Sequence, residues 1–169
     1  LVGRPLGLKV NSEYPWNGKM TLQPQLESPA QFELRLRVPG WCDAFKASVN
    51  GAEIAQPTLE RGYLVLAREW RSGDTAELNL DMPVRRIAAN PNVKADQGLL
   101  AIQRGPLVYC LEQVDQPDPI PSLYLSPGAV LKPEKNGELF GGIVVIKGMA
   151  EAAAAQDWTG RLYDPVNTA

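Results

Sequence analysis

Histidine is absent from the 169 residues of this chain. Its absence removes the usual general base, the commonest metal ligand, and the Ser-His and Cys-His pairs of nucleophilic catalysis. Only two cysteines are present, Cys42 and Cys110, and neither has a partner at metal-ligand spacing. Both lie beside apolar strands, so we expect buried free thiols rather than a disulfide. The sequence predicts no metal site and no cofactor within this chain.

An excess of one charge and long apolar runs are also missing. Seventeen basic residues stand against nineteen acidic ones, and the basic residues are scattered singly. That pattern gives no electrostatic footprint for a nucleic acid. Hydrophobic residues make up 44% of the chain, yet no uninterrupted apolar run approaches the length of a membrane span. We therefore expect neither nucleic acid nor a membrane as a partner.

The acidic residues show no sign of a catalytic pair. General acid–base hydrolysis needs two carboxyl groups facing one cleft. Here Asp74 falls in a turn, Glu33 on the charged face of a strand, and Asp115 and Asp118 in a proline-rich segment. Solvated surface is the simpler interpretation, because acidic side chains are mostly exposed.

Alternation of apolar and polar residues indicates β-structure throughout. Residues 31–38 are the clearest strand, because every second residue from Phe32 is apolar and those between are charged. Residues 47–49 and 52–54 flank Asn50-Gly51, which suits a type I′ hairpin turn. Residues 62–68 and 76–80 are expected to pair around a turn at 72–74, and an edge strand is expected at residues 82–84.

These short strands, with 15 glycines and 15 prolines, predict an all-β fold, an antiparallel β-sandwich or jelly roll. The boundary between two sandwiches, the second incomplete, is placed at residues 114–121, where three prolines suggest an extended linker. It separates a sandwich over residues 1–113 from a partial or divergent second β region over residues 122–169. That region is expected to hold strands at residues 123–125, 129–131 and 143–147, and a short helical turn at residues 151–156.

One stretch joins two apolar strands through an arginine-containing turn. Residues 97–112 read QGLLAIQRGPLVYCLE, with strands at 99–102 and 107–111 that we expect to be buried, joined through Gln-Arg-Gly-Pro. Two further motifs are YPWNGK at residues 14–19 and RVPGWC at residues 37–42. Together they resemble glycoside hydrolase family 127, typified by bacterial β-L-arabinofuranosidases and once classed as a domain of unknown function. The resemblance runs from about residue 6 to residue 112.

The resemblance implies that this chain is an ancillary region of a bacterial glycoside hydrolase. In the family these motifs lie in β-sandwich domains that follow a helical catalytic barrel. The barrel carries a zinc-bound cysteine nucleophile and a glutamate acid/base, and its site needs an adjacent pair of cysteines. This chain has no such pair, so no catalytic residue or zinc ligand is carried over to it. Because the chain begins at Leu1 rather than at a methionine, we interpret it as a piece of a longer polypeptide.

Seven residues are candidates for a functional or structural role. Tyr14, Trp16 and Trp41 are candidates for stacking on sugar rings, although core or domain-interface packing is the simpler interpretation for each. Arg104, Gly105, Pro106 and Tyr109 are expected to act structurally between domains, with the Arg104 guanidinium clamping a carboxylate. Arg104 could equally reach a ligand.

Three functions remain open. The first is bracing of the missing barrel of the same polypeptide, with a dimer contact as an addition. The second is a carbohydrate-binding module that works by itself, and the third is an oligomerising domain. Exposure separates them, because lined-up exposed aromatics favour sugar binding whereas buried tryptophans favour bracing.

Overall fold

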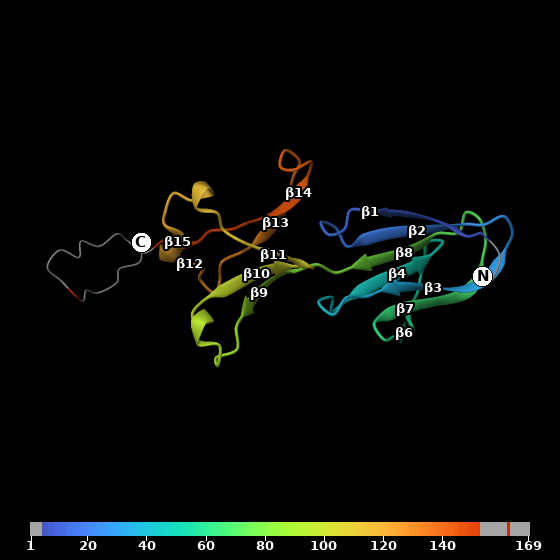
Figure 1. The fold of residues 1–169 in the computed structure, drawn as a ribbon, viewed down its shortest axis with the longest axis horizontal. Coiled ribbons are helices and arrows are strands. Elements are labelled where there is room, and N and C mark those ends of the chain that lie inside the picture. The colour runs from blue at the N-terminus through green and yellow to red at the C-terminus, as the bar shows by residue number, and fades with distance from the viewer. Residues whose placement is uncertain (1–4, 153–161, 163–169) are drawn as a thin grey trace. The chain divides into compact units, whose positions relative to one another are not determined.

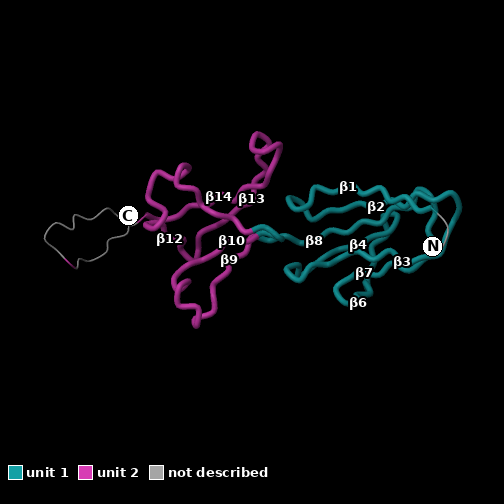
Figure 2. Tube along the Cα trace, viewed as in Figure 1, with its two compact units in different colours: residues 1–83, 104–107 teal, residues 84–103, 108–169 magenta. Residues whose placement is uncertain are grey.

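The computed structural model describes residues 5–152 and Leu162, which form strands and short 3-10 helices (Figure 1). The all-β prediction is confirmed. The chain divides into two compact units, one made of residues 1–83 with 104–107 and the other of residues 84–103 with 108–169 (Figure 2). Within the described ranges no helix is long and apolar enough to cross a membrane.

The first unit is a sandwich of two antiparallel sheets. One sheet has five strands in the order β1-β2-β8-β4-β5, and the other has three in the order β3-β7-β6. The strands are β1 (Gly7–Ser12), β2 (Lys19–Gln25), β3 (Ala30–Arg37), β4 (Phe45–Val49), β5 (Ala52–Glu53), β6 (Leu59–Glu60), β7 (Tyr63–Trp70) and β8 (Ala76–Leu80).

The core of this unit lies between the two sheets. Strand β3 aligns with β7 so that Leu36 faces Leu64, and the charged residues of β3 point to the other side. Leu64 and Trp70 of β7 are completely buried, in one cluster with Leu78 of the opposite sheet. The Phe32 ring stacks on Trp70 with ring centroids 6.0 Å apart. The period-two pattern of residues 31–38 therefore identified a core strand correctly.

The Asn50-Gly51 hairpin is confirmed. Both residues have positive φ, 53° and 79°, as a type I′ turn between β4 and β5 requires. Asn50 also fixes the neighbouring turn, because its side-chain amide donates to Asp74 and its oxygen accepts the Thr75 N–H. Asn50 therefore stabilises both the turn between β4 and β5 and the turn that precedes β8.

Two strand predictions in the first unit are wrong. Strands β7 and β8 do not pair with each other, since β7 joins β3 and β6 whereas β8 joins β2 and β4. The turn at residues 72–74 exists, with Asp74 N–H bonded to the Arg71 carbonyl, but it crosses from one sheet to the other. Met82 and Pro83 form no edge strand. Met82 is buried, and the next strand begins at Val84.

The second unit consists of small sheets. They are a three-stranded sheet β11-β10-β9 and two two-stranded sheets, β12-β15 and β13-β14. Its elements are β9 (Val84–Ala88), η1 (Lys94–Asp96), β10 (Leu100–Arg104), β11 (Leu107–Tyr109), η2 (Gln113–Asp115), η3 (Ile120–Ser122), β12 (Leu123–Tyr124), β13 (Lys132–Asn136), β14 (Ile143–Lys147) and β15 (Glu151–Ala152).

No hydrophobic residue of this unit is buried within residues 84–103 and 108–152. The two strands around the Gln-Arg-Gly-Pro turn were expected to be buried, and this expectation is wrong. Leu99 is 62% exposed, Val108 69% and Leu111 55%. The buried core of the described residues lies in the first unit.

The unit boundary differs from the predicted one. The chain passes from the first unit to the second between Pro83 and Val84, and the tip of the β10–β11 hairpin, residues 104–107, is grouped with the first unit. The proline-rich residues 114–121 instead contain η2 and η3 within the second unit. Proline content reports local extension, whereas the division into units depends on which distant strands pair.

Other local predictions in the second unit had mixed outcomes. Residues 143–147 form β14 as expected, and residues 123–125 contain β12. Residues 129–131 form no strand, because β13 begins at Lys132. The expected helical turn at residues 151–156 begins instead with strand β15, and its remainder lies outside the described residues.

Candidate functional site

The Gln-Arg-Gly-Pro turn is a tight connection between β10 and β11. Gly105 has φ 56° and is followed by Pro106, which fits a type II′ hairpin turn with glycine at its first central position. Gly105 is buried against Met82, and a Cβ added there would approach the Met82 Cε to 2.9 Å. The positive φ therefore favours glycine at this position, where the flexible Met82 side chain packs closely.

Arg104 holds a main-chain carbonyl. Its Nη1 donates to the Trp16 oxygen over 2.8 Å, within the first unit. Its Nε is buried and has no hydrogen-bond partner in the part of the chain that the structure describes. The acceptor is thus a peptide carbonyl rather than the carboxylate that the sequence suggested. A charged donor on a carbonyl still makes a stronger bond than a neutral one.

Arg104 thereby reaches the loop that carries the YPWNGK motif. The Trp16 and Asn17 N–H groups both bond to the Glu13 carbonyl, and the Asn17 side-chain oxygen accepts the Lys19 N–H. The Tyr14–Pro15 peptide bond is cis. Gly18 ends the loop so close to β8 that an added Cβ would lie 2.0 Å from the Leu80 carbonyl oxygen. Two of the sequence motifs are therefore joined in space.

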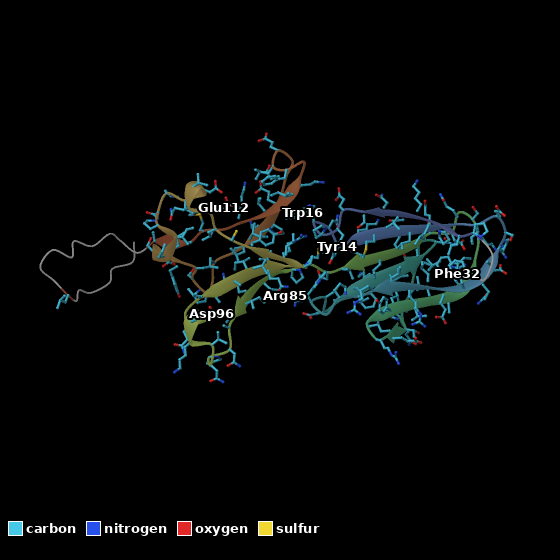
Figure 3. The ribbon with its side chains drawn as sticks, viewed as in Figure 1. Tyr14, Trp16, Phe32, Arg85, Asp96 and Glu112 are labelled. Carbon is cyan, nitrogen blue, oxygen red and sulfur yellow. The ribbon has the colours of Figure 1, made fainter. Side chains whose placement is uncertain are left out.

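The three candidate sugar-binding aromatics differ in exposure. Figure 3 labels the side chains of Tyr14 and Trp16. Tyr14 is 41% exposed, whereas Trp16 is half-buried. Trp41 is half-buried and packs against the core cluster. Tyr14 and Trp16 lie on one loop, while Trp41 follows β3. These positions give Trp41 a packing role, and they leave Tyr14 as the exposed member of the set.

Tyr109 belongs to β11 in the second unit and is half-buried. Its hydroxyl is buried without a hydrogen-bond partner among the described residues. Buried tyrosine hydroxyls usually find a partner, so this group is left unsatisfied by the residues around it.

The two cysteines are free thiols in different settings. Cys42 is half-buried, and its Sγ lies 3.0 Å from the Ala44 carbonyl oxygen, to which the thiol donates. Burial raises the pKa of the Cys42 thiol, which favours its protonated form. Cys110 is exposed, so the expectation that both thiols are buried is wrong for this residue.

The described residues do not provide the group of ligands that a zinc ion needs. Within the described ranges there is no group of three or more His, Cys, Asp or Glu side chains that could hold a metal ion. We therefore derive no chemical step through zinc in this chain.

Two carboxylates do meet, on the outer face of the three-stranded sheet. Arg35 lies 2.6 Å from Glu33 and 2.9 Å from Glu60, and all three side chains are about half exposed. The hydrogen bond that Arg35 donates to Glu33 is the main cause that raises the pKa of Arg35, followed by the one that it donates to Glu60. A shared arginine that neutralises both acids on an open face is typical of a solvated surface rather than of an acid–base pair.

Two shallow hollows lie along β1 and β2, and the smaller one also includes residues of the motif-bearing loop. Cavities of about 300 Å³ and about 280 Å³ share Asn11 and Thr21 in their linings. The remaining lining residues are mostly polar: Lys9, Val10 and Gln23 in the larger, and Ser12, Glu13, Asn17 and Lys19 in the smaller.

Two residues that hold distant segments together, Gly18 and Arg86, were not predicted from the sequence. Gly18 was noted only as part of a turn, and its contact with Leu80 depends on a distant strand. Arg86 of β9 donates to the carbonyls of Ser126, Pro127 and Ala129, and so holds residues 126–129 within the second unit. No local pattern marks either residue, because their partners lie far away in sequence.

The two units of this fold match two family models of ancillary glycoside hydrolase domains. Residues 2–82 match the family model described as the GH127 middle domain of β-L-arabinofuranosidase. Residues 84–156 match the model described as the glycoside hydrolase family 127 C-terminal domain. The chain belongs to glycoside hydrolase family 127.

Relatives support this membership over the whole chain. A non-reducing end β-L-arabinofuranosidase of Bifidobacterium longum subsp. longum is 38% identical over 73% of this chain. The crystal structure of a GH127 β-L-arabinofuranosidase from Geobacillus stearothermophilus T6 is 38% identical, with a TM-score of 0.92 over the full chain. A structure described as a GH127 β-arabinofuranosidase is 33% identical, with a TM-score of 0.82 over 95% of this chain.

The chain spans only part of these relatives. It covers 19% of the Bifidobacterium protein and 27% of each of the two solved structures. The boundary between the two family models falls at residues 82–84, where the two units of the structure meet.

Proposed function

We propose that this chain is the non-catalytic part of a β-L-arabinofuranosidase-like glycoside hydrolase and that it braces a helical catalytic barrel in the same polypeptide. One observation carries the proposal. The described residues of the second unit bury no hydrophobic side chain, although many are large and apolar. Zinc and the catalytic residues would belong to the barrel.

The second unit needs a partner to offset the entropy cost of folding. Burying a large apolar side chain contributes about 1.5–3 kcal/mol, and ordering the backbone costs about 1–2 kcal/mol per residue. Val114 is 86% exposed and Met149 83%, so these side chains contribute almost nothing in this chain alone. An isolated two-stranded sheet is marginal at best in water.

Strand β14 also needs a partner that covers its apolar side chains. Its residues Ile143–Lys147 begin with four consecutive apolar residues, all half-buried, and β13 is its hydrogen-bonded neighbour. A continuous apolar run is typical of a strand covered on both faces. Such a strand with an open edge is an aggregation hazard unless another part of the protein covers it.

Dye binding tests the bracing role. The isolated chain should bind an apolar-surface dye such as ANS, whereas the whole gene product that carries this chain should bind far less dye per molecule. Equal dye binding by both proteins, or none by the isolated chain, would contradict the bracing role.

We propose structural roles for the residues of the Gln-Arg-Gly-Pro turn. Arg104, Gly105 and Pro106 fix the hairpin tip and, through the Trp16 carbonyl, the loop before β2. Tyr109 would complete the hydrogen bond of its hydroxyl against the partner domain, because the described residues offer none.

Sugar binding is a second candidate because Tyr14 is exposed between residues that line the smaller polar hollow. Ser12 and Glu13 precede it and Asn17 follows it in that lining. Calorimetric titration with L-arabinose and arabinan oligosaccharides tests this function. Saturable heat that is lost in Tyr14→Ala but kept in Tyr63→Ala would support sugar binding. Absence of heat would leave bracing as the function.

A further inference from the structure

The loop between β13 and β14 is a firmly built turn. The Asn136 side-chain oxygen accepts the N–H groups of Glu138 and Leu139, over 3.0 and 3.4 Å. The Gly142 N–H then bonds to the Leu139 carbonyl over 2.8 Å. Figure 1 shows this loop at the free end of its hairpin. The loop is therefore held in one shape by bonds of its own.

Phe140 occupies an unusual position in this loop. It has φ 48°, a left-handed conformation that is an outlier for a bulky side chain, and it is followed by Gly141 and Gly142 with φ 78° and 113°. Its side chain is 92% exposed, the highest exposure among the large hydrophobic residues described. Asparagine or glycine would adopt this backbone with less strain.

Neither the strain nor the exposure is explained by the hairpin itself. An aromatic ring in water gains nothing from packing, and a Cβ built at Gly141 or Gly142 would meet no atom within 4 Å. Strained, exposed positions that the surrounding structure fixes are characteristic of contacts with a ligand or partner.

We propose that Phe140 is an anchor that inserts into an apolar pocket on the catalytic barrel of the same polypeptide. This inference rests on the proposed bracing function and names the residue through which the second unit docks. Rigid aromatic side chains that fill a pocket at the centre of an interface often contribute most of the binding energy.

The barrel is a better occupant than a second copy of this chain. The two hollows beside β1 and β2 are open and mostly polar, so neither suits a phenyl ring. The solved relatives place 73% of their length outside the region matched here, which leaves ample chain to form such a pocket. The two family models are the middle and C-terminal domains, so most of that length precedes this region.

Limited proteolysis of the whole gene product tests the anchor. Cleavage within the second unit reports how often this unit separates from its partner, provided that opening is fast relative to cleavage. Phe140→Ser should raise the cleavage rate about tenfold, which corresponds to about 1.4 kcal/mol of lost docking energy. Phe140→Leu should raise it less, because leucine still fills an apolar pocket.

The same loop offers a matched control in Glu138→Ser, which removes a polar side chain and should leave the rate unchanged. If Phe140→Ser is cleaved at the same rate as the unmodified protein, the anchor is refuted but the bracing function is not. The same holds if Glu138→Ser raises the cleavage rate as much as Phe140→Ser does. If the unmodified gene product is already cut in this unit as fast as the isolated chain, the bracing function fails and the anchor with it.

Discussion

At the scale of single residues, the two signature motifs meet through close contacts. Arg104 binds the Trp16 carbonyl, Gly105 lies against Met82, and Gly18 lies against the Leu80 backbone. Each contact joins residues that are distant in sequence. These contacts give each motif a packing role within the first unit.

Replacement of Gly18 by alanine should be strongly destabilising. Its Cβ would lie 2.0 Å from the Leu80 carbonyl oxygen, and backbone atoms cannot move aside as a side chain can. We expect a loss of about 1–3 kcal/mol in the free energy of unfolding, measured with urea. Gly40→Ala is the control, because an added Cβ there meets no atom within 4 Å. Equal stability of the two variants would refute this contact.

Replacement of Arg104 by methionine should lower stability by about 1 kcal/mol. The Trp16 carbonyl loses its charged donor, while removal of the unsatisfied Nε offsets part of the cost. Arg71→Met is the control, because the Arg71 side chain is 70% exposed and its bond to Glu69 lies at the surface. Thermal unfolding followed by tryptophan fluorescence measures both. A larger loss in the Arg71 variant would contradict this assignment.

At the scale of elements, the turn between β7 and β8 determines how the two sheets connect. Asp74 accepts hydrogen bonds from the Asn50 side chain and the Arg71 N–H, over 2.8 and 2.9 Å. The Asn50 bond is the main cause that lowers the pKa of Asp74, with the Arg71 bond second. The ionised carboxylate therefore favours the folded state.

This turn should make the first unit less stable in acid. Because the Asp74 pKa is lower when folded, its contribution is complete above the unfolded pKa and is lost as the pH falls through the folded pKa. Asp74→Asn should flatten the dependence of unfolding free energy on pH in this acid range. Glu69→Gln serves as the control. An unchanged pH profile in Asp74→Asn would show that other carboxylates account for the acid sensitivity.

The sequence was informative where structure is local. Period-two alternation located β3, and Asn50-Gly51 located a hairpin, because both depend on neighbouring residues. It failed for β7 and β8, since strand partners depend on contacts across the sandwich. The motifs that indicated the family also drew attention to Arg104. Its acceptor could not be predicted, because every residue has a main-chain carbonyl like that of Trp16. The strained Phe140 was likewise invisible, because its φ follows from the whole loop.

At the scale of the whole molecule, stability should be concentrated in the first unit. Leu64→Ala removes a completely buried side chain and should cost about 2–5 kcal/mol in the isolated chain. Val114→Ser, at a residue 86% exposed in the second unit, should change stability by less than about 0.5 kcal/mol. Urea titration compares them. A large loss in Val114→Ser would mean that the second unit has a core of its own.

The central claim is that the second unit depends on a partner domain, and hydrogen–deuterium exchange tests it most directly. Amides of β7 and β8 should be protected both in the isolated chain and in the whole gene product. Amides of β10 and β14 should exchange rapidly in the isolated chain and become protected only in the longer protein. Equal, strong protection of β10 and β14 in both proteins would contradict the account.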